Sequence, residues 1–177
     1  GVTASNAASP ACASAAVKQR PWHSKCCEVD GIMTTNELHG YYFEDLSVGM
    51  TAHFGKTITD ADILLFAGVS GDTNPSHINE EFARTTRMKT RVAHGMLSAS
   101  LISAIFGCEL PGPGCLYVSQ TVNFRSPVKP GDTVNARVSL RRLDAKRNFA
   151  EFETICKVGD EVVVDGSALI WVPSRAA

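Results

Sequence analysis

Apolar and polar positions follow a regular pattern over most of the 177-residue chain, from about residue 41 to its end. Five stretches are rich in apolar and β-branched residues at strand-like spacing: residues 51–58, 116–124, 133–143, 149–158 and 162–172. Turn sequences separate the later stretches, Pro130-Gly131-Asp132 and Gly159-Asp160, and they favour antiparallel neighbours. The pattern therefore predicts one strand, an interval, and then four consecutive strands.

The interval after the first predicted strand carries helix signals. Thr59 is a candidate N-cap with an acidic residue, Asp62, at the third helical position, and Gly71 is expected to end this first helix. Asn79 can cap a second, short helix. The segment between the two helices, residues 72–77, has the composition of a loop.

A third helix, residues 95–106, is apolar or small on nearly every face, and Gly107 is expected to end it. Because it has no charged side, this helix should be buried on all sides. The order of strand, helices and four strands indicates an α+β fold in which an antiparallel sheet wraps around a central buried helix, the hot-dog fold. A single sheet has open edges, so a homodimer joined edge to edge is expected.

Length and composition limit the number of domains. A chain of 177 residues with 44% hydrophobic and 20% charged residues is expected to form one globular domain. Residues 1–32 differ, since they are rich in Ala and Ser and show neither helical nor strand periodicity. We interpret them as a disordered leader, a cloning remnant or a transit-like extension, and residues 33–177 as the single domain.

Charge and hydropathy exclude several classes of partner. Seventeen Lys and Arg residues against eighteen Asp and Glu leave a net charge of −1, too small for sequence-independent nucleic-acid binding. No apolar run reaches the ~18 residues of a membrane span.

The cysteines bear on the redox compartment. Three of the six cysteines lie in the first thirty residues, and no C-x-x-C pair exists. Reduced thiols and a cytoplasmic location are expected, or a mitochondrial location if the first segment is a transit peptide.

The predicted loop contains the candidate chemistry. Asp72 and His77 lie five positions apart with Pro75 between them, so a turned segment would bring the carboxylate and the imidazole together. Such a pair beside one water molecule can add water to a double bond or remove it. The alternative is an ordinary turn in which Asp72 caps backbone amides.

A metal site is not expected in this loop. The run from Asp72 resembles half of a calcium-binding loop, but position six is His77 instead of Gly and position twelve is Ala83 instead of Glu. Zinc held by Asp72, His77 and His94 is geometrically feasible, yet no zinc motif surrounds these residues.

Three segments resemble the MaoC-like (R)-specific enoyl-CoA hydratases: FAGVSGDTNPSHIN at residues 66–79, VAHGM at 92–96, and VNFRSPV at 122–128 with Gly131-Asp132 after it. The resemblance covers about residues 43–173. It implies the hot-dog fold and reversible syn hydration of a trans-2-enoyl thioester to the (3R)-3-hydroxyacyl thioester. It also implies that Asp72 and His77 are the catalytic pair. No cofactor is expected, since coenzyme A is part of the substrate.

Three further residues are candidates for supporting roles. The resemblance gives Ser103 a place on the central helix from which it would support the pair by hydrogen bonding; the alternative is a serine bonded back to its own helix. Gly95 opens that helix, where a free backbone N–H can bind the thioester oxygen, or it only begins a tight turn. Asn74 is expected to orient the loop rather than to contact substrate.

A basic stretch precedes the central helix: Arg84, Arg87, Lys89 and Arg91. These side chains are candidates for binding the phosphates of an acyl-CoA or the surface of an acidic acyl carrier protein, and the alternative is a solvated face. A 3-hydroxyacyl-[acyl-carrier-protein] dehydratase therefore stays open as a second function.

Two other functions also stay open. A hot-dog thioesterase would hydrolyse the same substrates, but those enzymes generally place a lone carboxylate on or near the central helix, and residues 96–106 contain none. A non-catalytic acyl-binding or assembly subunit is the other alternative, although such subunits lack the catalytic pair that is present here.

Overall fold

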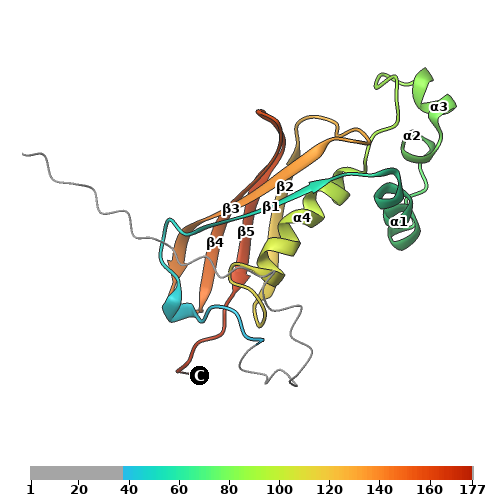
Figure 1. The fold of residues 1–177 in the computed structure, drawn as a ribbon. Helices are drawn as coiled ribbons and strands as arrows, with labels where there is room; N and C mark the ends of the chain where they lie inside the picture. Colours follow the sequence, from blue (N-terminus) through green and yellow to red (C-terminus); the bar gives the residue numbers. More distant parts are fainter. Residues whose placement is uncertain (1–37, 177) are drawn as a thin grey trace, which may run out of the picture. The chain divides into compact units, whose positions relative to one another are not determined.

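The computed structural model of the chain describes residues 38–176. In chain order the elements are η2 (Phe43–Asp45), β1 (Thr51–Thr57), α1 (Asp60–Ser70), α2 (Pro75–Ile78), α3 (Glu80–Thr85), α4 (Gly95–Cys108), β2 (Leu116–Phe124), β3 (Thr133–Asp144), β4 (Phe149–Val158) and β5 (Glu161–Trp171). The strands form one sheet in the order β1-β3-β4-β5-β2 (Figure 1), and every neighbouring pair is antiparallel.

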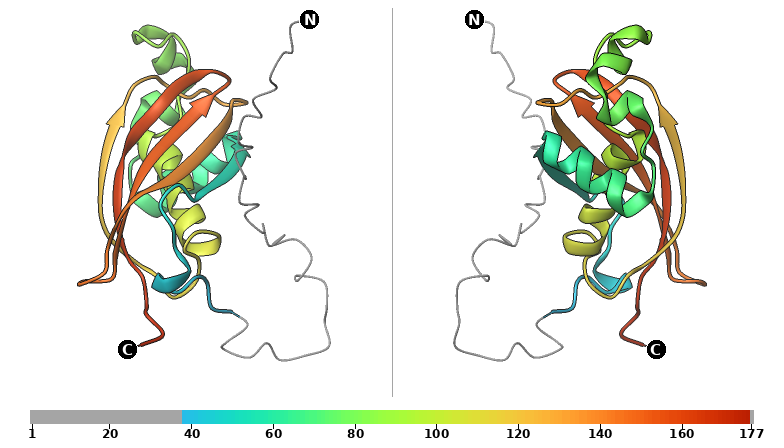
Figure 2. Two further views of the ribbon diagram at one scale, coloured as in Figure 1. Left: turned by 90° about the vertical axis from the view of Figure 1, so that its left-hand side faces the viewer. Right: turned by 90° about the vertical axis from the view of Figure 1, so that its right-hand side faces the viewer.

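Helix α4 packs along one face of the sheet, and the strands curve around it (Figures 1 and 2). It contacts all five strands. Its buried residues Ile102 and Phe106 join a hydrophobic core with Val138 of β3 and Phe152 of β4, and the rings of Phe106 and Phe152 meet edge to face with centroids 4.9 Å apart. This arrangement confirms the predicted hot-dog fold.

The start and end of α1 follow the predicted capping chemistry. The Thr59 hydroxyl accepts a hydrogen bond from the backbone N–H of Asp62 at 3.2 Å, and the Asp62 carboxylate accepts one from the backbone N–H of Thr59 at 2.9 Å. Hydrogen bonds from Thr59 and Lys56 hold the pKa of Asp62 down to about 2. Gly71 ends the helix with a φ of 77°, a left-handed conformation that favours glycine.

Three predicted strands, residues 51–58, 133–143 and 162–172, differ from β1, β3 and β5 by one residue at one end or at both. Two further differences concern the helices. The segment 72–77 is only partly a loop, because Pro75 begins the short helix α2 after Asn74 has capped it. Gly107 does not end α4, which continues to Cys108. Glycine lowers helix stability but does not forbid a helical turn, and the backbone N–H of Glu109 bonds to the Ile105 carbonyl at 2.8 Å, which continues the helix past Gly107.

The prediction that the central helix is buried on all sides is also wrong for the single chain. One stripe of α4 is exposed, and Met96 has 57% of its surface accessible. Ser100, Ser103 and Gly107 continue this stripe at helical spacing. The sheet covers one side of α4 only, so an uncharged helix face does not by itself prove burial.

The predicted leader, residues 1–32, lies outside the described residues. Within residues 38–176, no helix is long and apolar enough to cross a membrane.

Candidate active site

The loop between α1 and α2 is held in shape by its own polar side chains. The Asp72 carboxylate accepts a hydrogen bond from the backbone N–H of Asn74 at 3.2 Å. The Asn74 side chain in turn accepts one from the backbone N–H of Ser76 at 3.0 Å and so caps α2. With Pro75 at the first helical position, this turn carries the chain from Asp72 directly to His77.

His77 is held by a backbone carbonyl from a distant part of the chain. Its Nδ1 lies 2.7 Å from the carbonyl oxygen of Val92, so Nδ1–H donates and the neutral ring keeps a free lone pair on Nε2. That Nε2 is 4.0 Å from Oδ2 of Asp72. The separation is too long for a direct hydrogen bond and suits one bridging water molecule.

His94 connects both members of the pair. Its Nε2–H donates to the backbone carbonyl of Asp72 at 2.9 Å, and its ring lies against the His77 ring with centroids 3.8 Å apart and planes tilted by 31°. On another side it contacts Phe66, with centroids 5.0 Å apart. A single buried residue therefore sets the position of the Asp72 backbone and of the His77 ring.

Asp72, His77 and His94 are also the one group among the described residues that could hold a metal ion, with ligand atoms within 4.8 Å of one another. Each histidine donates a hydrogen bond from one ring N–H to a backbone carbonyl, as metal ligands commonly do. The two rings lie against each other, however, with centroids 3.8 Å apart and planes tilted by 31°, and no zinc motif surrounds these residues. The arrangement suits a proton-transfer pair better than a tetrahedral zinc site.

A cavity of about 690 Å³ is lined by Asp72, His94 and the first turn of α4, while His77 is not among its lining residues. Exposed Arg87 and Arg125 lie on its lining, whereas His94, Ser98 and Val163 form a buried inner wall. A long, partly polar ligand would therefore place its charged part near the arginines and its small or apolar part inside.

Gly95 lies where the cavity meets the N-terminus of α4. Its backbone N–H is among those at a helix start that lack an intrahelical partner, and the helix dipole makes this position favourable for a developing negative charge. A Cβ at this position would come within 2.7 Å of the Phe124 ring. Glycine therefore lets the Phe124 ring lie against the start of α4, and a side chain at this position would have to displace that ring.

The comparisons with known proteins agree with this geometry. The family model described as "MaoC like domain" matches residues 46–163. The chain belongs to the MaoC-like family. It is 50% identical over 143 residues to an (R)-specific enoyl-CoA hydratase of Rhodospirillum rubrum, a match that covers 81% of this chain and 99% of the relative. It is also 50% identical over 139 residues to a 3-hydroxybutyryl-CoA dehydratase of Methylorubrum extorquens, covering 78% of this chain and 88% of the relative.

Solved structures of MaoC-like hydratases have the same fold. The unliganded R-hydratase PhaJ1 from Pseudomonas aeruginosa superimposes with a TM-score of 0.73 at 39% identity, covering 77% of this chain and 88% of the other. The (R)-hydratase from Aeromonas caviae gives a TM-score of 0.72 at 37% identity, covering 73% and 99%. Hydratases and dehydratases of this kind are hydro-lyases, so the chain is placed among enzymes of that class.

The serine predicted to support the pair in this MaoC-like chain makes no hydrogen bond with it among the described residues, and its supporting role stays a prediction. Ser103 lies on the exposed stripe of α4 and makes no hydrogen bond with Asp72 or His77 in the described chain. Ser98 instead lies on the cavity wall and is 1% exposed. The sequence analysis missed Ser98 and the positioning role of His94. Their spacing of one helical turn, with Gly95 between them, is the signal that would have placed them on one face.

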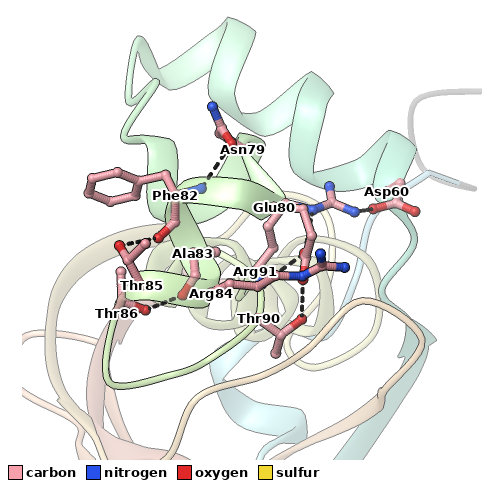
Figure 3. Close-up of polar contacts among 10 residues, drawn as sticks. All are labelled: Asp60, Asn79, Glu80, Phe82, Ala83, Arg84, Thr85, Thr86, Thr90 and Arg91. Carbon is pink, nitrogen blue, oxygen red and sulfur yellow. Dashed lines mark hydrogen bonds and ion pairs between the residues drawn. The ribbon is translucent and has the colours of Figure 1, made fainter.

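The four basic candidates of the MaoC-like chain have different surroundings. Arg87 lies on the cavity. Lys89 is exposed at a positive φ of 60° and does not line it. Arg91 pairs with Asp60 at 2.8 Å and with Glu80 at 3.2 Å (Figure 3). Arg84 is also directed to Glu80, at 3.6 Å.

Arg91 joins two helices through ion pairs, a role that its place in a run of basic residues does not predict. Figure 3 shows its guanidinium between the first residues of α1 and α3, Asp60 and Glu80. The Glu80 carboxylate also accepts hydrogen bonds from the backbone N–H of Arg91 and the hydroxyl of Thr90, both at 3.2 Å. The pKa of Glu80 is lowered, chiefly because of the Arg91 backbone hydrogen bond. The next residue along the chain is Val92, whose carbonyl holds His77.

Arg91→Ala is expected to loosen this segment. We expect a loss of about 1 kcal/mol in the free energy of unfolding, since the ion pairs are only partly buried. Urea denaturation measures it, with Arg84→Ala as the stability control because that side chain is 71% exposed. Equal stability of the two variants would show that the Arg91 network does not hold the loop.

Proposed function

We propose that the chain is an (R)-specific enoyl-CoA hydratase that reversibly adds water to trans-2-enoyl-CoA and forms (3R)-3-hydroxyacyl-CoA. The observation that carries this proposal is the separation of 4.0 Å between the Asp72 carboxylate and Nε2 of His77, beside a cavity that Asp72 and Gly95 line. This spacing fits one water molecule between an acid and a base. The two relatives at 50% identity, named for a hydratase and a dehydratase, support both directions of one reaction.

Gly95 binds the thioester, and Asp72 and His77 activate the water. The Gly95 N–H at the start of α4 donates to the thioester carbonyl, which draws electrons from C3 of the enoyl group. A water held by Asp72 and His77 attacks C3, and Nε2 of His77 accepts its proton because the Val92 carbonyl keeps Nδ1 protonated. The Asp72–His77 pair, which has taken up the water proton, delivers one proton to C2 from the same side. Both new bonds therefore form on one face of the double bond.

The absorbance of the enoyl-thioester band with crotonyl-CoA tests this function. Loss of the band without free thiol is the expected result. Release of free thiol would indicate a thioesterase, and an unchanged band with measurable binding would indicate a non-catalytic subunit. Either of these outcomes would overturn the proposal.

The proposed reaction needs no metal, and coenzyme A enters as part of the substrate. We expect enzyme dialysed against a chelator to keep its full rate of crotonyl-CoA hydration, because the water is activated by His77 and not by a Lewis acid. Added Zn²⁺ should not raise this rate. A rate that falls on chelation and returns with a divalent cation would assign a metal to Asp72, His77 and His94.

A homodimer is part of the proposal. Strand β2 lies at one edge of the sheet and carries exposed apolar side chains, among them Leu116 (60%) and Val118 (48%). An unpaired apolar edge favours pairing with another strand, and the matching strand of a second copy is the proposed partner. Sedimentation equilibrium should give about twice the chain mass of 19.0 kDa. We expect Val118→Lys to shift it toward a single chain, and a wild-type protein that sediments as one chain would contradict the dimer.

Coenzyme A is the proposed carrier, and the cytoplasm is the proposed location. Arg87 and Arg125 on the cavity can approach its phosphates, although Arg125 is already paired with Asp165 at 2.6 Å. An acyl carrier protein is the alternative carrier, since a mitochondrial 3-hydroxyacyl-[acyl-carrier-protein] dehydratase of Arabidopsis thaliana is 35% identical over 133 residues. If the Michaelis constant rises more steeply with salt for the carrier-protein thioester than for the coenzyme A thioester, the substrate is delivered by protein docking.

The proposed location is supported by the cysteines. The three cysteines of the described chain are free thiols, which is consistent with a reducing compartment.

A further inference from the structure

Two buried polar atoms on the cavity wall lack a hydrogen-bond partner within the described part of the chain: Nδ1 of His94 and Oγ of Ser98. The two residues are 2% and 1% exposed, and both line the cavity. Buried polar groups are nearly always paired with protein or with ordered water. The pair therefore marks a position where a small polar molecule is expected to complete the hydrogen bonds.

The hydrogen bonding of His94 defines what this position can accept. Its Nε2–H is donated to the Asp72 carbonyl, so Nδ1 of the neutral ring carries a lone pair and needs a donor. The Ser98 hydroxyl can donate or accept. One water molecule can donate to Nδ1 of His94 and bond to Oγ of Ser98 at the same time, which satisfies both atoms.

Ser98 differs from Ser70 and Ser100, two other serines in helices of the described chain. A serine inside a helix usually bonds back to a carbonyl of the preceding turn, and Ser70 and Ser100 do so, with distances of 2.6 Å to Phe66 and 2.7 Å to Leu97. The corresponding carbonyl for Ser98 is that of His94, which accepts from the backbone N–H groups of Leu97 and Ser98 but not from the Ser98 hydroxyl. The Ser98 hydroxyl is left for the cavity.

The position of Ser98 relates it to the acyl group of the substrate. It lies three residues after Gly95, about 4.5 Å further along the helix axis at the usual rise per residue. It belongs to the buried part of the cavity lining, as Val163 and Val164 do, whereas the arginines on that lining are exposed. If Gly95 holds the thioester carbonyl, the inner wall is the part of the cavity that receives the carbon chain beyond it.

We propose that Ser98 and His94 form a water-binding subsite that makes the enzyme selective for short acyl chains, with Ser98 as the specificity-determining residue. The inference rests on the proposed hydratase function. A short acyl group leaves the water in place. A longer apolar tail displaces it and leaves Nδ1 of His94 and the Ser98 hydroxyl buried without partners, which is unfavourable.

Hydration rates along a ladder of crotonyl-, trans-2-hexenoyl- and trans-2-octenoyl-CoA test the subsite. Wild-type enzyme should have its highest kcat/KM with crotonyl-CoA. Ser98→Ala should raise the ratio of octenoyl to crotonyl kcat/KM by about tenfold, because displacement of the water then leaves one fewer unpaired group. Ser100→Ala, on the same helix but bonded to Leu97, should leave this ratio unchanged.

The outcomes separate failure of the subsite from failure of the function. A folded Ser98→Ala enzyme with the wild-type ratio, or a wild-type enzyme that prefers octenoyl-CoA, would overturn the subsite while leaving the hydratase intact. No hydration at any chain length by the wild type would overturn the proposed function itself. A high-resolution crystal structure adds an independent readout: water bonded to both Nδ1 of His94 and Oγ of Ser98 supports the subsite, and a Ser98 hydroxyl bonded to the His94 carbonyl contradicts it.

Discussion

Asp72→Asn and His77→Gln are each expected to lower kcat for crotonyl-CoA hydration by about 10²- to 10⁴-fold, the usual contribution of general acid–base catalysis. The Asn variant removes the ionisable oxygen but keeps an oxygen that can accept the hydrogen bond from the Asn74 backbone. The loop should therefore retain its shape. In the Gln variant the ring lone pair that faces the water is lost, although the chain around Val92 is unchanged.

Matched controls separate catalysis from folding. Asp160→Asn changes an exposed carboxylate in the turn between β4 and β5, and His53→Gln changes an exposed imidazole on β1. Both controls should keep wild-type rates, and all four variants should melt within a few degrees of the wild type. If Asp72→Asn or His77→Gln folds normally and turns over at the wild-type rate, that residue is not a member of the catalytic pair.

Gly95→Ala is expected to lower kcat/KM by about 10²-fold, since displacement of a bound substrate by about 1 Å has an effect of this size. The added methyl group would lie 2.7 Å from Cε1 of Phe124 and would occupy the space beside the first amide of α4. Either the Phe124 ring moves into the cavity or the thioester is held away from the amide. Steady-state kinetics with crotonyl-CoA measure the effect.

The same substitution elsewhere on α4 is the control. At Gly107 an added Cβ meets no atom within 4 Å, so Gly107→Ala should leave kcat/KM unchanged and should stabilise the helix slightly. The double variant Gly95→Ala with Phe124→Ala should recover part of the lost rate if the clash with the ring is the cause. Wild-type kinetics for Gly95→Ala would show that the thioester does not bind at this amide.

Local signals predicted most of the fold correctly. Residues 116–124 and 149–158 are the strands that their patterns predict, since turn sequences delimit them clearly. The cap at Thr59 and the stop at Gly71 depend on residues within one turn of the helix end, so sequence alone identifies them. The predicted end of α4 was wrong because a glycine can stay helical where the backbone hydrogen bonds continue, here from Glu109 to Ile105.

The site was only partly predictable because its geometry depends on contacts between distant segments. Asp72 and His77 are close in sequence, and the turn at Pro75 brings them together as expected, while their catalytic roles stay a prediction. His94 reaches the Asp72 carbonyl only because the end of α1 and the start of α4 meet in the fold. The choice of Ser98 over Ser103 for the cavity wall depends on which face of α4 the sheet covers. The sequence of an apolar helix does not show which of its faces the sheet will cover.

The stereochemistry of water addition tests the central claim most directly, namely that Asp72 and His77 act on one water from one face of the substrate. Crotonyl-CoA should be hydrated in deuterium oxide, and the product analysed for its configuration at C2 and C3. The account predicts (3R)-3-hydroxybutyryl-CoA with deuterium at C2 on the same face as the new hydroxyl, that is, syn addition. Anti addition, or a mixture of both configurations at C2, would contradict it.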